Sequence, residues 1–451
     1  MALTQQQLTE TKVRSSQARE SGLGERVRQL RVAAGLTQTE LAGTRFSKEY
    51  VSQIERGKTR PTTETIRWLA GRLAVDATFL QHGVSADERE RIEAVIARAS
   101  ALSESDRFPE AIEEYEAIRD AVLATGSSEL EVRMLAGQAW ARMRTGDPKY
   151  AIELLTRARE LAEGPQFSDV DRADLLFRLG VCRFWLSSIA TAVALLNEAL
   201  ALTDRSDLPC DGLRSQILAV RSRCRRRQRD WEAAREDVER ALELAEGLSD
   251  QRALAEVYFQ ASLVAERMGH WVRARKYAEL AKSCYEEIAD RGNVGRMLNN
   301  LGGLNFLLGQ PQKAEVFLKD AFRVALDVGN ETDAAYAVSS LAQVHLRSGD
   351  ASRAEEQARH ALNLLDGRLD QLNEIGNAQL VLGRALLEQG RLDEADGALR
   401  ESEASLAQLS SASHRAAAWI AQGDLASRRG DDSGAARLYR MAAEALQDFH
   451  F

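Results

Sequence analysis

Apolar side chains recur every three or four residues over long stretches of this chain, a spacing that places them on one face of an α-helix. Near the N-terminus this pattern predicts helices over residues 23–34, 63–73 and 76–81. Their polar residues fall on the opposite face, as in helices that cover a small core. The apolar positions predicted to face that core are Leu23, Val27, Leu30 and Ala34, then Ile66, Leu69, Ala70 and Leu73.

Two more short helices are expected within Gly35–Pro61, where capping residues mark the helix ends. Thr37 can cap the first helix, and Glu40 three residues later completes the capping-box spacing. Ser47 can cap the second helix, which Gly57 then ends. The buried residues are expected to be Leu41 and Ala42 in the first helix, and Val51 and Ile54 in the second.

This stretch resembles the λ-repressor-like (XRE-type) helix-turn-helix family, whose pattern is G-[LM]-[ST]-Q-x-x-L-A followed by S-x-x-x-[IV]-S-x-[IW]-E-x-G-x-x-x-P. The turn at residues 43–46 is shorter than in the family, and Phe46 is expected to supply its apolar side chain. The matching residues are Gly35, Leu36, Thr37, Gln38, Leu41, Ala42, Ser47, Val51, Ser52, Ile54, Glu55, Gly57 and Pro61.

The resemblance implies that the partner is double-stranded DNA and that the second helix enters the major groove. Polar side chains on that helix can donate to or accept from base edges. Gln38 resembles the family's phosphate-contacting glutamine, helped by the N-terminus of its helix. The alternative is that these are ordinary solvated residues. The implied DNA-binding residues are Gln38, Ser47, Lys48, Glu49, Ser52, Gln53, Lys58, Thr59 and Arg60.

Charge is distributed unevenly along the 451 residues, whose net charge is −8. Residues 21–82 hold ten Lys or Arg and six Asp or Glu, so this predicted DNA-binding domain is basic and the remainder acidic. A basic domain suits phosphate contact, while the acidic part would be repelled by DNA. Residues 1–20 have no periodic apolar face and are interpreted as a flexible solvated arm; contact of Arg14 and Arg19 with DNA is the alternative.

From about residue 86 a self-similar unit appears, in which a helix, a turn and a second helix carrying paired alanines follow one another. The first alanine of each pair recurs at intervals of 40 to 42 residues, which defines nine units. A small side chain is needed where two helices cross closely. We place a short linker at residues 83–87 and the repeats at 88–451. The first alanines are Ala111, Ala151, Ala192, Ala234, Ala274, Ala314, Ala354, Ala395 and Ala435.

The unit resembles the tetratricopeptide repeat (TPR), whose usual period is about 34 residues. The longer period here is similar to the extended TPR subclass. Ile118 and Ser402 replace the second alanine in the first and eighth units, which are therefore degenerate. With only six prolines, the composition also favours an all-α protein. The expected fold is a five-helix λ-repressor-like domain followed by a right-handed TPR α-solenoid of about nine hairpins.

The first helix of each hairpin is expected to line a concave inner surface. The TPR register places these residues on it: Arg133, Trp140, Phe177, Phe184, Arg223, Arg226, Glu256, Phe259, Arg296, Asn299, Phe306, Tyr336, Gln343, Asn377 and Arg384. Amides and guanidiniums can hold a peptide backbone and its carboxylates, although asparagine is also common as a solvated residue. The predicted peptide-binding residues are Arg296, Asn299, Asn300, Tyr336, Gln343, Asn377 and Arg384.

The run Arg221–Arg229 is strongly basic. The favoured interpretation is a helix C-terminus, where cations complement the helix dipole. An additional DNA contact and an anionic ligand pocket at Arg223 and Arg226 are the alternatives.

Several function classes are disfavoured. The six histidines lack metal-binding spacings, and no P-loop, G-x-S-x-G or G-x-G-x-x-G motif occurs, so we predict no enzyme activity and no cofactor. Cys182, Cys210, Cys224 and Cys284 form no C-x-x-C pair and are expected to be idle thiols in a reducing cytosol. No apolar run approaches about 18 residues and no secretory signal is evident, so a cytoplasmic protein without a membrane span is expected.

In domain order, the chain resembles the peptide-responsive RRNPP-type transcription regulators. The resemblance implies a cytoplasmic homodimer in which a short peptide, bound by the repeats, changes the spacing of two recognition helices. One alternative is a regulator whose repeats bind another protein. A second is a scaffold with a vestigial helix-turn-helix, which intact Gln38, Lys48 and Gln53 disfavour.

Overall fold

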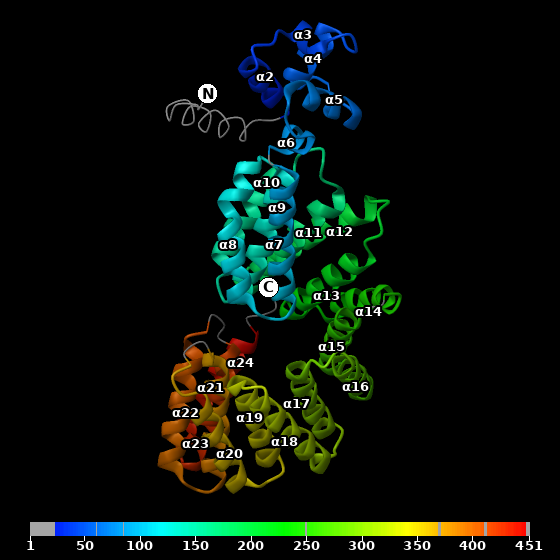
Figure 1. The fold of residues 1–451 in the computed structure, drawn as a ribbon. Helices are drawn as coiled ribbons and strands as arrows, with labels where there is room; N and C mark the ends of the chain where they lie inside the picture. Colours follow the sequence, from blue (N-terminus) through cyan, green and yellow to red (C-terminus); the bar gives the residue numbers. More distant parts are fainter. Residues whose placement is uncertain are drawn as a thin grey trace. The chain divides into compact units, whose positions relative to one another are not determined.

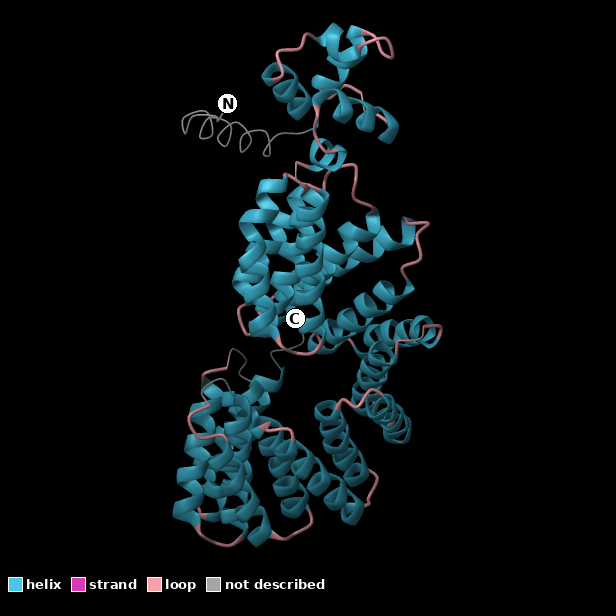
Figure 2. Cartoon of the chain, in the orientation of Figure 1, coloured by secondary structure: helices cyan, strands magenta, loops and turns pink. Residues whose placement is uncertain are grey.

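The computed structural model describes residues 23–59, 61–83, 85–248, 250–368, 371–409 and 413–447. Within these ranges the regular structure is helical and no strand occurs (Figure 2). The predicted all-α fold class is therefore confirmed. The chain forms two compact units, residues 1–213 and 214–451, and each is treated by itself. None of the described helices has the length and apolarity needed to cross a membrane.

The first unit begins with five short helices that form a small domain. The predicted helices over 63–73 and 76–81 correspond to α5 and α6, and the predicted helix over 23–34 to α2. Ala34 is exposed, contrary to its predicted inward position, because α2 has ended and Gly35 turns the chain with φ +70°. The five helices are α2 (Leu23–Ala33), α3 (Gln38–Ala42), α4 (Lys48–Glu55), α5 (Thr63–Leu73) and α6 (Ala77–His82) (Figure 1).

The predicted caps set the starts of α3 and α4. The Thr37 hydroxyl accepts from the Glu40 N–H at 3.1 Å, and the Glu40 carboxylate accepts from the Thr37 N–H at 2.7 Å, which completes the capping box. The Ser47 hydroxyl accepts from the Tyr50 N–H at 3.1 Å. Both caps are thus confirmed. The apolar faces of the helices meet in one core, which includes Val27, Leu41, Ala42, Val51, Ile54, Ile66, Leu69 and Leu80.

Arg26 is a core residue that the apolar pattern does not reveal, since only 4% of it is exposed. Its Nε donates to the Leu80 carbonyl at 3.1 Å, and its Nη2 donates to the Gln81 carbonyl at 2.6 Å. These carbonyls lie in the last turn of α6, where backbone acceptors have no partner within the helix. Burial lowers the pKa of the Arg26 guanidinium, and the two carbonyl contacts compensate part of its lost hydration. Arg26 therefore fastens α2 to the end of α6.

Helical hairpins occupy the rest of the described chain, as predicted. Helical structure resumes at Ala86, inside the predicted linker 83–87. The hairpins in residues 86–205 are α7 (Ala86–Glu104) with α8 (Phe108–Thr125), α9 (Ser128–Arg144) with α10 (Pro148–Leu161), and α11 (Asp169–Trp185) with α12 (Ile189–Arg205). Then follow α13 (Asp211–Arg227) with α14 (Trp231–Glu246), α15 (Gln251–Arg267) with α16 (Trp271–Glu287), α17 (Arg291–Leu307) with α18 (Pro311–Asp327), α19 (Glu331–Arg347) with α20 (Ala351–Leu364), α21 (Leu372–Glu388) with α22 (Leu392–Ala407), and α23 (Ser413–Arg428) with α24 (Asp432–Gln447) (Figure 1).

The repeating alanines lie where the two helices of each hairpin approach most closely. All nine predicted first alanines are buried. Twelve residues before each, on the first helix, stands another small buried residue, which permits the close approach. Where that residue is Ser222, its hydroxyl donates to the Ala234 carbonyl at 2.8 Å. The nine first-helix residues are Ala99, Ala139, Gly180, Ser222, Ser262, Gly302, Ala342, Gly383 and Gly423.

The second alanine of the pair tolerates the two replacements noted in the sequence. Ser402 is fully buried, and its hydroxyl donates to the Gly376 carbonyl at 2.7 Å, so its polar group is satisfied. Ile118 is also buried, with 8% exposed. The first and eighth repeats therefore both form the helical hairpin, although their sequences depart from the alanine pattern.

Gly302→Ala is expected to destabilise the second unit, whereas Gly303→Ala is expected to stabilise it. A Cβ on Gly302 would lie 2.5 Å from Cγ of the buried Leu318, while a Cβ on Gly303 meets nothing within 4 Å. Overpacking costs about 1–3 kcal/mol, against a helix-propensity gain of about 0.5–1 kcal/mol that both variants share. Urea denaturation followed by circular dichroism measures both changes, and equal shifts in the two variants would contradict this packing.

The four cysteines are buried and free, as the spacing indicated. Burial raises the pKa of Cys182 and Cys224 to about 11. Because the thiolate is the reactive form, we expect almost no reaction with a disulfide reagent such as DTNB at pH 8 in the native protein, and full reaction in denaturant. Fast labelling of native protein at either residue would contradict this burial.

Candidate functional site

The predicted DNA-reading residues lie on the outer side of α4. Lys48, Glu49 and Gln53 are exposed and Ser52 is half-buried, while Val51 and Ile54 on the other side enter the core. Positions 48, 49, 52 and 53 share one face of a helix because they repeat with its turn. The structure therefore groups these four side chains, with Ser47 at the cap directly before them.

The loop after α4 is tied to the same face. The Thr59 hydroxyl donates to Oε1 of Gln53 at 3.0 Å, and Lys58 beside it is exposed. The loop starts at Gly57, which has φ +67°, a conformation that glycine adopts readily. Arg60, also predicted to contact DNA, lies outside the described residues, as does the predicted arm over residues 1–20.

A buried ionic cluster holds α2, α3 and α4 together, and we call Arg31, Gln38 and Glu55 the Glu55 network. Arg31 Nε donates to Glu55 Oε1 at 2.6 Å, and Gln38 Nε2 donates to Glu55 Oε2 at 2.7 Å. Arg31 Nη1 also donates to the Leu36 carbonyl at 2.8 Å. Burial acts to raise the pKa of Glu55, but the hydrogen bonds from Arg31 and Gln38 outweigh it and the pKa is lowered. The network fixes the direction of α4 relative to α2 and α3.

Sequence reasoning matched Glu55 to the family pattern without giving it a role, and it did not select Arg31 at all. Arg31 stands seven residues before Gln38, on another helix, and only the fold brings it to Glu55. Gln38, predicted to contact phosphate, lies at the start of α3 with its amide directed to Glu55.

Phe46 fills the turn between α3 and α4, as predicted. Its ring lies 5.1 Å from the Trp68 ring, edge to face, and 5.2 Å from the Tyr50 ring, measured between centroids. These contacts connect the turn to α5 and α4. The short turn is thus anchored in the core and positions the start of α4.

In the second unit, side chains on successive first helices contact one another, and we call the set on α13, α15, α17, α19 and α21 the first-helix face. Arg296 Nε on α17 donates to Asp333 Oδ2 on α19 at 3.0 Å. The Tyr336 hydroxyl on α19 donates to Gln371 Oε1, directly before α21, at 2.6 Å. Three of the predicted effector-binding helices are therefore linked in sequence order.

The two adjacent asparagines of α17 have different surroundings. Asn300 Oδ1 accepts from the Ser262 hydroxyl on α15 at 3.0 Å, and Asn300 Nδ2 donates to Glu266 at 3.5 Å. Asn299 Oδ1 is buried and has no hydrogen-bond partner. Asn300 thus supports the junction with α15, while Asn299 has an acceptor that remains to be satisfied.

The remaining predicted residues extend the face to α21. Gln343 is exposed, and Asn377 lies beside Glu374, whose pKa burial raises. Burial also lowers the pKa of Arg384, and Arg384 Nη2 donates to the Ala417 carbonyl at 3.5 Å. This part of the face therefore carries an acid, amide groups and a guanidinium. In the first unit, by contrast, Phe177 is only 6% exposed, so it belongs to the packing between helices.

The structure divides the basic run Arg221–Arg229 by helix face. Arg221 and Arg225 contact the buried carboxylate of Asp237 on α14, at 2.6 Å and 3.3 Å. Arg223 and Arg226 face the other way, toward α15. The run is thus neither a uniform surface patch nor one pocket.

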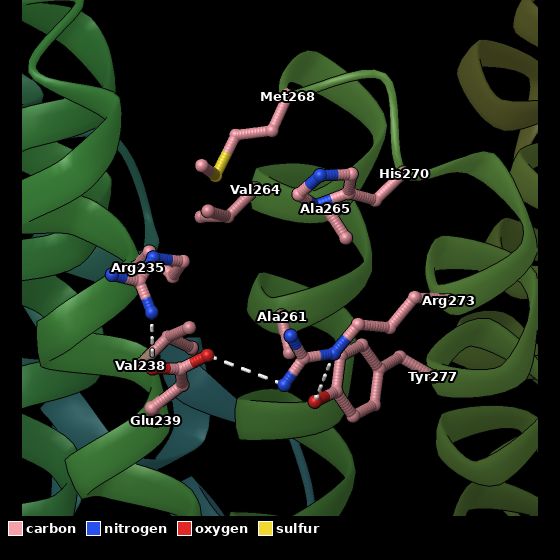
Figure 3. Close-up of a pocket in the computed structure, with 10 residues that line it drawn as sticks. All are labelled: Arg235, Val238, Glu239, Ala261, Val264, Ala265, Met268, His270, Arg273 and Tyr277. Carbon is pink, nitrogen blue, oxygen red and sulfur yellow. Dashed lines mark hydrogen bonds and ion pairs between the residues drawn. The ribbon is translucent and has the colours of Figure 1, made fainter.

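A small pocket lies between α14, α15 and α16 and is lined mainly by apolar side chains (Figure 3). Its charged groups are paired with one another: Glu239 contacts Arg235 at 2.8 Å and Arg273 at 3.2 Å, and Arg273 Nε donates to the Tyr277 hydroxyl at 3.1 Å. None of the predicted effector-binding residues lines it. We therefore interpret it as a packing gap closed by ion pairs.

Comparisons with known proteins agree with this division of the chain. A helix-turn-helix domain model matches residues 22–82, and tetratricopeptide repeat models match residues 96–166 and 293–366. A search of curated protein sequences gives no match. The sequence resemblance to both repeat and DNA-binding families is therefore confirmed at the level of domains.

Solved structures share the fold at low identity. A Rap protein complexed with Competence and Sporulation Factor is 13% identical, with a TM-score of 0.59 over 80% of this chain and 98% of that one. The apo quorum sensor NprR from B. thuringiensis is 11% identical, with a TM-score of 0.60 over 80% and 99% of the two chains. A signal-transduction ATPase (STAND protein) with a tetratricopeptide repeat sensor, PH0952 from Pyrococcus horikoshii, is 17% identical, with a TM-score of 0.56 over 83% and 54%.

Such identities establish a common fold. The predicted resemblance to RRNPP-type regulators is confirmed for the fold, which the Rap and NprR structures share. This chain carries a helix-turn-helix domain followed by tetratricopeptide repeats, and it shares its fold with the Rap and NprR structures.

Proposed function

We propose that the chain is a sequence-specific transcription regulator whose repeats bind an effector, a short peptide, and thereby control its binding to DNA. The main observation behind this proposal is the exposed polar face of α4. The Ser47 cap and the buried Arg31–Glu55 contact hold that helix in place. Base recognition requires side chains in fixed positions. The Glu55 network and the packing of Phe46 against Tyr50 and Trp68 supply that rigidity.

The first-helix face supports the effector part of the proposal. It joins α15, α17, α19 and α21 through amides, guanidiniums and a tyrosine, groups that can bind a peptide backbone in several places. Rap was solved in complex with Competence and Sporulation Factor, and NprR is described as a quorum sensor. We propose a comparable effector here, bound by Arg296, Asn299, Asn300, Tyr336, Gln343, Asn377 and Arg384.

We further propose that the regulator acts as a homodimer. A single small domain buries too little DNA surface for tight binding, and two half-sites about one helical turn apart require two copies. An effector that changes how two repeat regions associate would change the spacing of the two α4 helices. Binding energy at the repeats would then alter affinity for DNA.

The proposal is tested by fluorescence anisotropy of the full chain on DNA from its own upstream region, at two salt concentrations. Each titration is repeated with a peptide extract of the producing cell. Specific, salt-sensitive binding that the extract shifts supports the proposal. Specific binding that is indifferent to the extract favours the alternative, a protein partner on the repeats. Absence of binding to any DNA would leave a scaffold with a vestigial helix-turn-helix.

A further inference from the structure

Four arginines gather where α13 and α15 end, and we call Arg223, Arg226, Arg227 and Arg267 the arginine cluster. Arg226 is central, because the charges of the other three all act on it. Two carboxylates oppose them: Glu256 lies 3.7 Å from Arg223, and Glu266 acts on Arg226 electrostatically. Around Arg226 itself, the charges of three arginines are thus opposed by that of Glu266.

The guanidinium of Arg226 is half-buried, and one of its N–H donors, Nε, has no acceptor. Its Nη2 donates to Gln260 Oε1 at 3.3 Å, while its Nε is buried and has no hydrogen-bond partner. Gln260 is itself only 3% exposed, and its Nε2 donates to Glu256 at 2.9 Å, which fixes its orientation. Burial, followed by the three neighbouring arginines, lowers the pKa of Arg226 to about 10. An anion here would relieve both the repulsion and the unmade hydrogen bond.

The helix dipole does not account for this arrangement. Cations are favoured in the last turn of a helix, and this explains the exposed Arg227 and Arg267. It does not explain a half-buried guanidinium that is exposed to three like charges and whose buried Nε has no hydrogen-bond partner. Arg221 and Arg225 show the contrast, since Asp237 supplies a counter-charge for both.

We propose that the arginine cluster is the subsite that binds a carboxylate group of the effector. A carboxylate matches the planar donor fork of a guanidinium, and a charge-assisted pair is stronger than a neutral hydrogen bond. The proposal rests on the proposed effector function and deepens it. Asn300 donates to Glu266, so the subsite is continuous through that side chain with the predicted peptide-binding residues of α17.

The carboxylate has two sources, the C-terminus of a peptide or an acidic side chain. Two heptapeptide libraries of identical composition separate them, one with free C-termini and one with C-terminal amides. The full chain is incubated with each library, and retained peptides are identified by mass spectrometry. Preference for the free-acid library indicates the C-terminus, while enrichment of Asp and Glu in both libraries indicates a side chain. Both outcomes support the subsite.

Variants decide whether the cluster is responsible. Arg226→Gln is expected to weaken binding of the selected peptides roughly tenfold or more, while Arg226→Lys, which keeps the charge without the fork, is expected to fall between. The matched control is Arg323→Gln on α18, an exposed arginine paired with Asp320. If Arg226→Gln does not fold, the exposed Arg267→Gln carries the test.

Three results would overturn the proposal. Peptides retained equally by Arg226→Gln, or without carboxylate preference, would remove the subsite and leave the effector function standing. If no peptide from either library is retained, the proposed peptide effector is contradicted as well. The DNA titration still tests separately whether the chain is a transcription regulator. Loss of DNA affinity in peptide-free Arg226→Gln would assign the cluster to nucleic acid.

Discussion

Glu55→Ala is expected to lower the free energy of unfolding of the helix-turn-helix domain by about 3 kcal/mol and to abolish DNA binding. The Glu55 side chain is 4% exposed and that of Arg31 is 13% exposed, so the change leaves a buried guanidinium without its counter-charge. Gln38 loses its acceptor in the same step. Thermal unfolding followed by circular dichroism, together with DNA titration, measures both effects.

A surface ion pair in the same domain provides the control. Arg45 and Glu64 are 2.5 Å apart but 45% and 75% exposed, so Glu64→Ala is expected to cost less than about 1 kcal/mol. The double variant Arg31→Ala with Glu55→Ala is expected to recover part of the loss, because no unpaired charge then remains buried. Equal effects of Glu55→Ala and Glu64→Ala would contradict the structural importance of the Glu55 network.

The same network gives a pH dependence. Because the pKa of Glu55 is lower in the folded state than its ordinary value of 4.5, its contribution is present above that pH. The contribution is lost as the pH falls through the folded-state pKa, when the carboxylate is protonated. The stability difference between the native protein and Glu55→Ala should therefore narrow on acidification, and a constant difference down to pH 2 would contradict the lowered pKa.

Lys48→Ala and Gln53→Ala are each expected to weaken binding to the specific DNA site by about 1–3 kcal/mol, roughly 5- to 150-fold. Both side chains are exposed on the outer face of α4, and their removal leaves the core unchanged. A base contact contributes only at the matching sequence, so affinity for random DNA should fall much less. Titrations on specific and random duplexes at one salt concentration give this ratio.

Lys313→Ala, which removes an exposed positive charge on α18, controls for net charge. It is expected to leave DNA affinity unchanged, because α18 belongs to the repeats and not to the helix-turn-helix domain. Equal losses on specific and random DNA for Lys48→Ala would show that Lys48 contacts phosphate and does not read bases. Such a result would also move the specificity residues to other positions of α4.

Much of the fold follows from local sequence. Thr37 and Ser47 were identifiable as caps because a side chain needs only its own helix start to make those hydrogen bonds. The hairpins were identifiable because two neighbouring helices cross closely in each of them. A small residue is needed at every such crossing, so it recurs along the sequence. The exposed face of α4 followed in the same way from the buried Val51 and Ile54.

Other features depend on residues that are distant in the sequence. Arg26 reaches carbonyls 54 and 55 residues away, and Arg31 reaches Glu55 across 24 residues. A polar pattern does not tell which charged side chains will be buried, because burial is decided by the helices that pack over them. Asn299 and Asn300 are neighbours of one type, yet only Asn300 contacts Ser262 on α15.

The sequence by itself determined the all-α class, the helix-turn-helix motif with its caps, and the nine-fold repetition of the hairpin, because these depend on hydrogen bonds and packing within one or two adjacent helices. Only the tertiary structure decided how the charges are partnered: Glu55 with Arg31 and Gln38, and Asp237 with Arg221 and Arg225. It also placed Arg226 among three arginines, with Glu266 as the opposing charge. Electrostatic partners are set by distance in space and by exclusion of water, and both arise when separate helices come together.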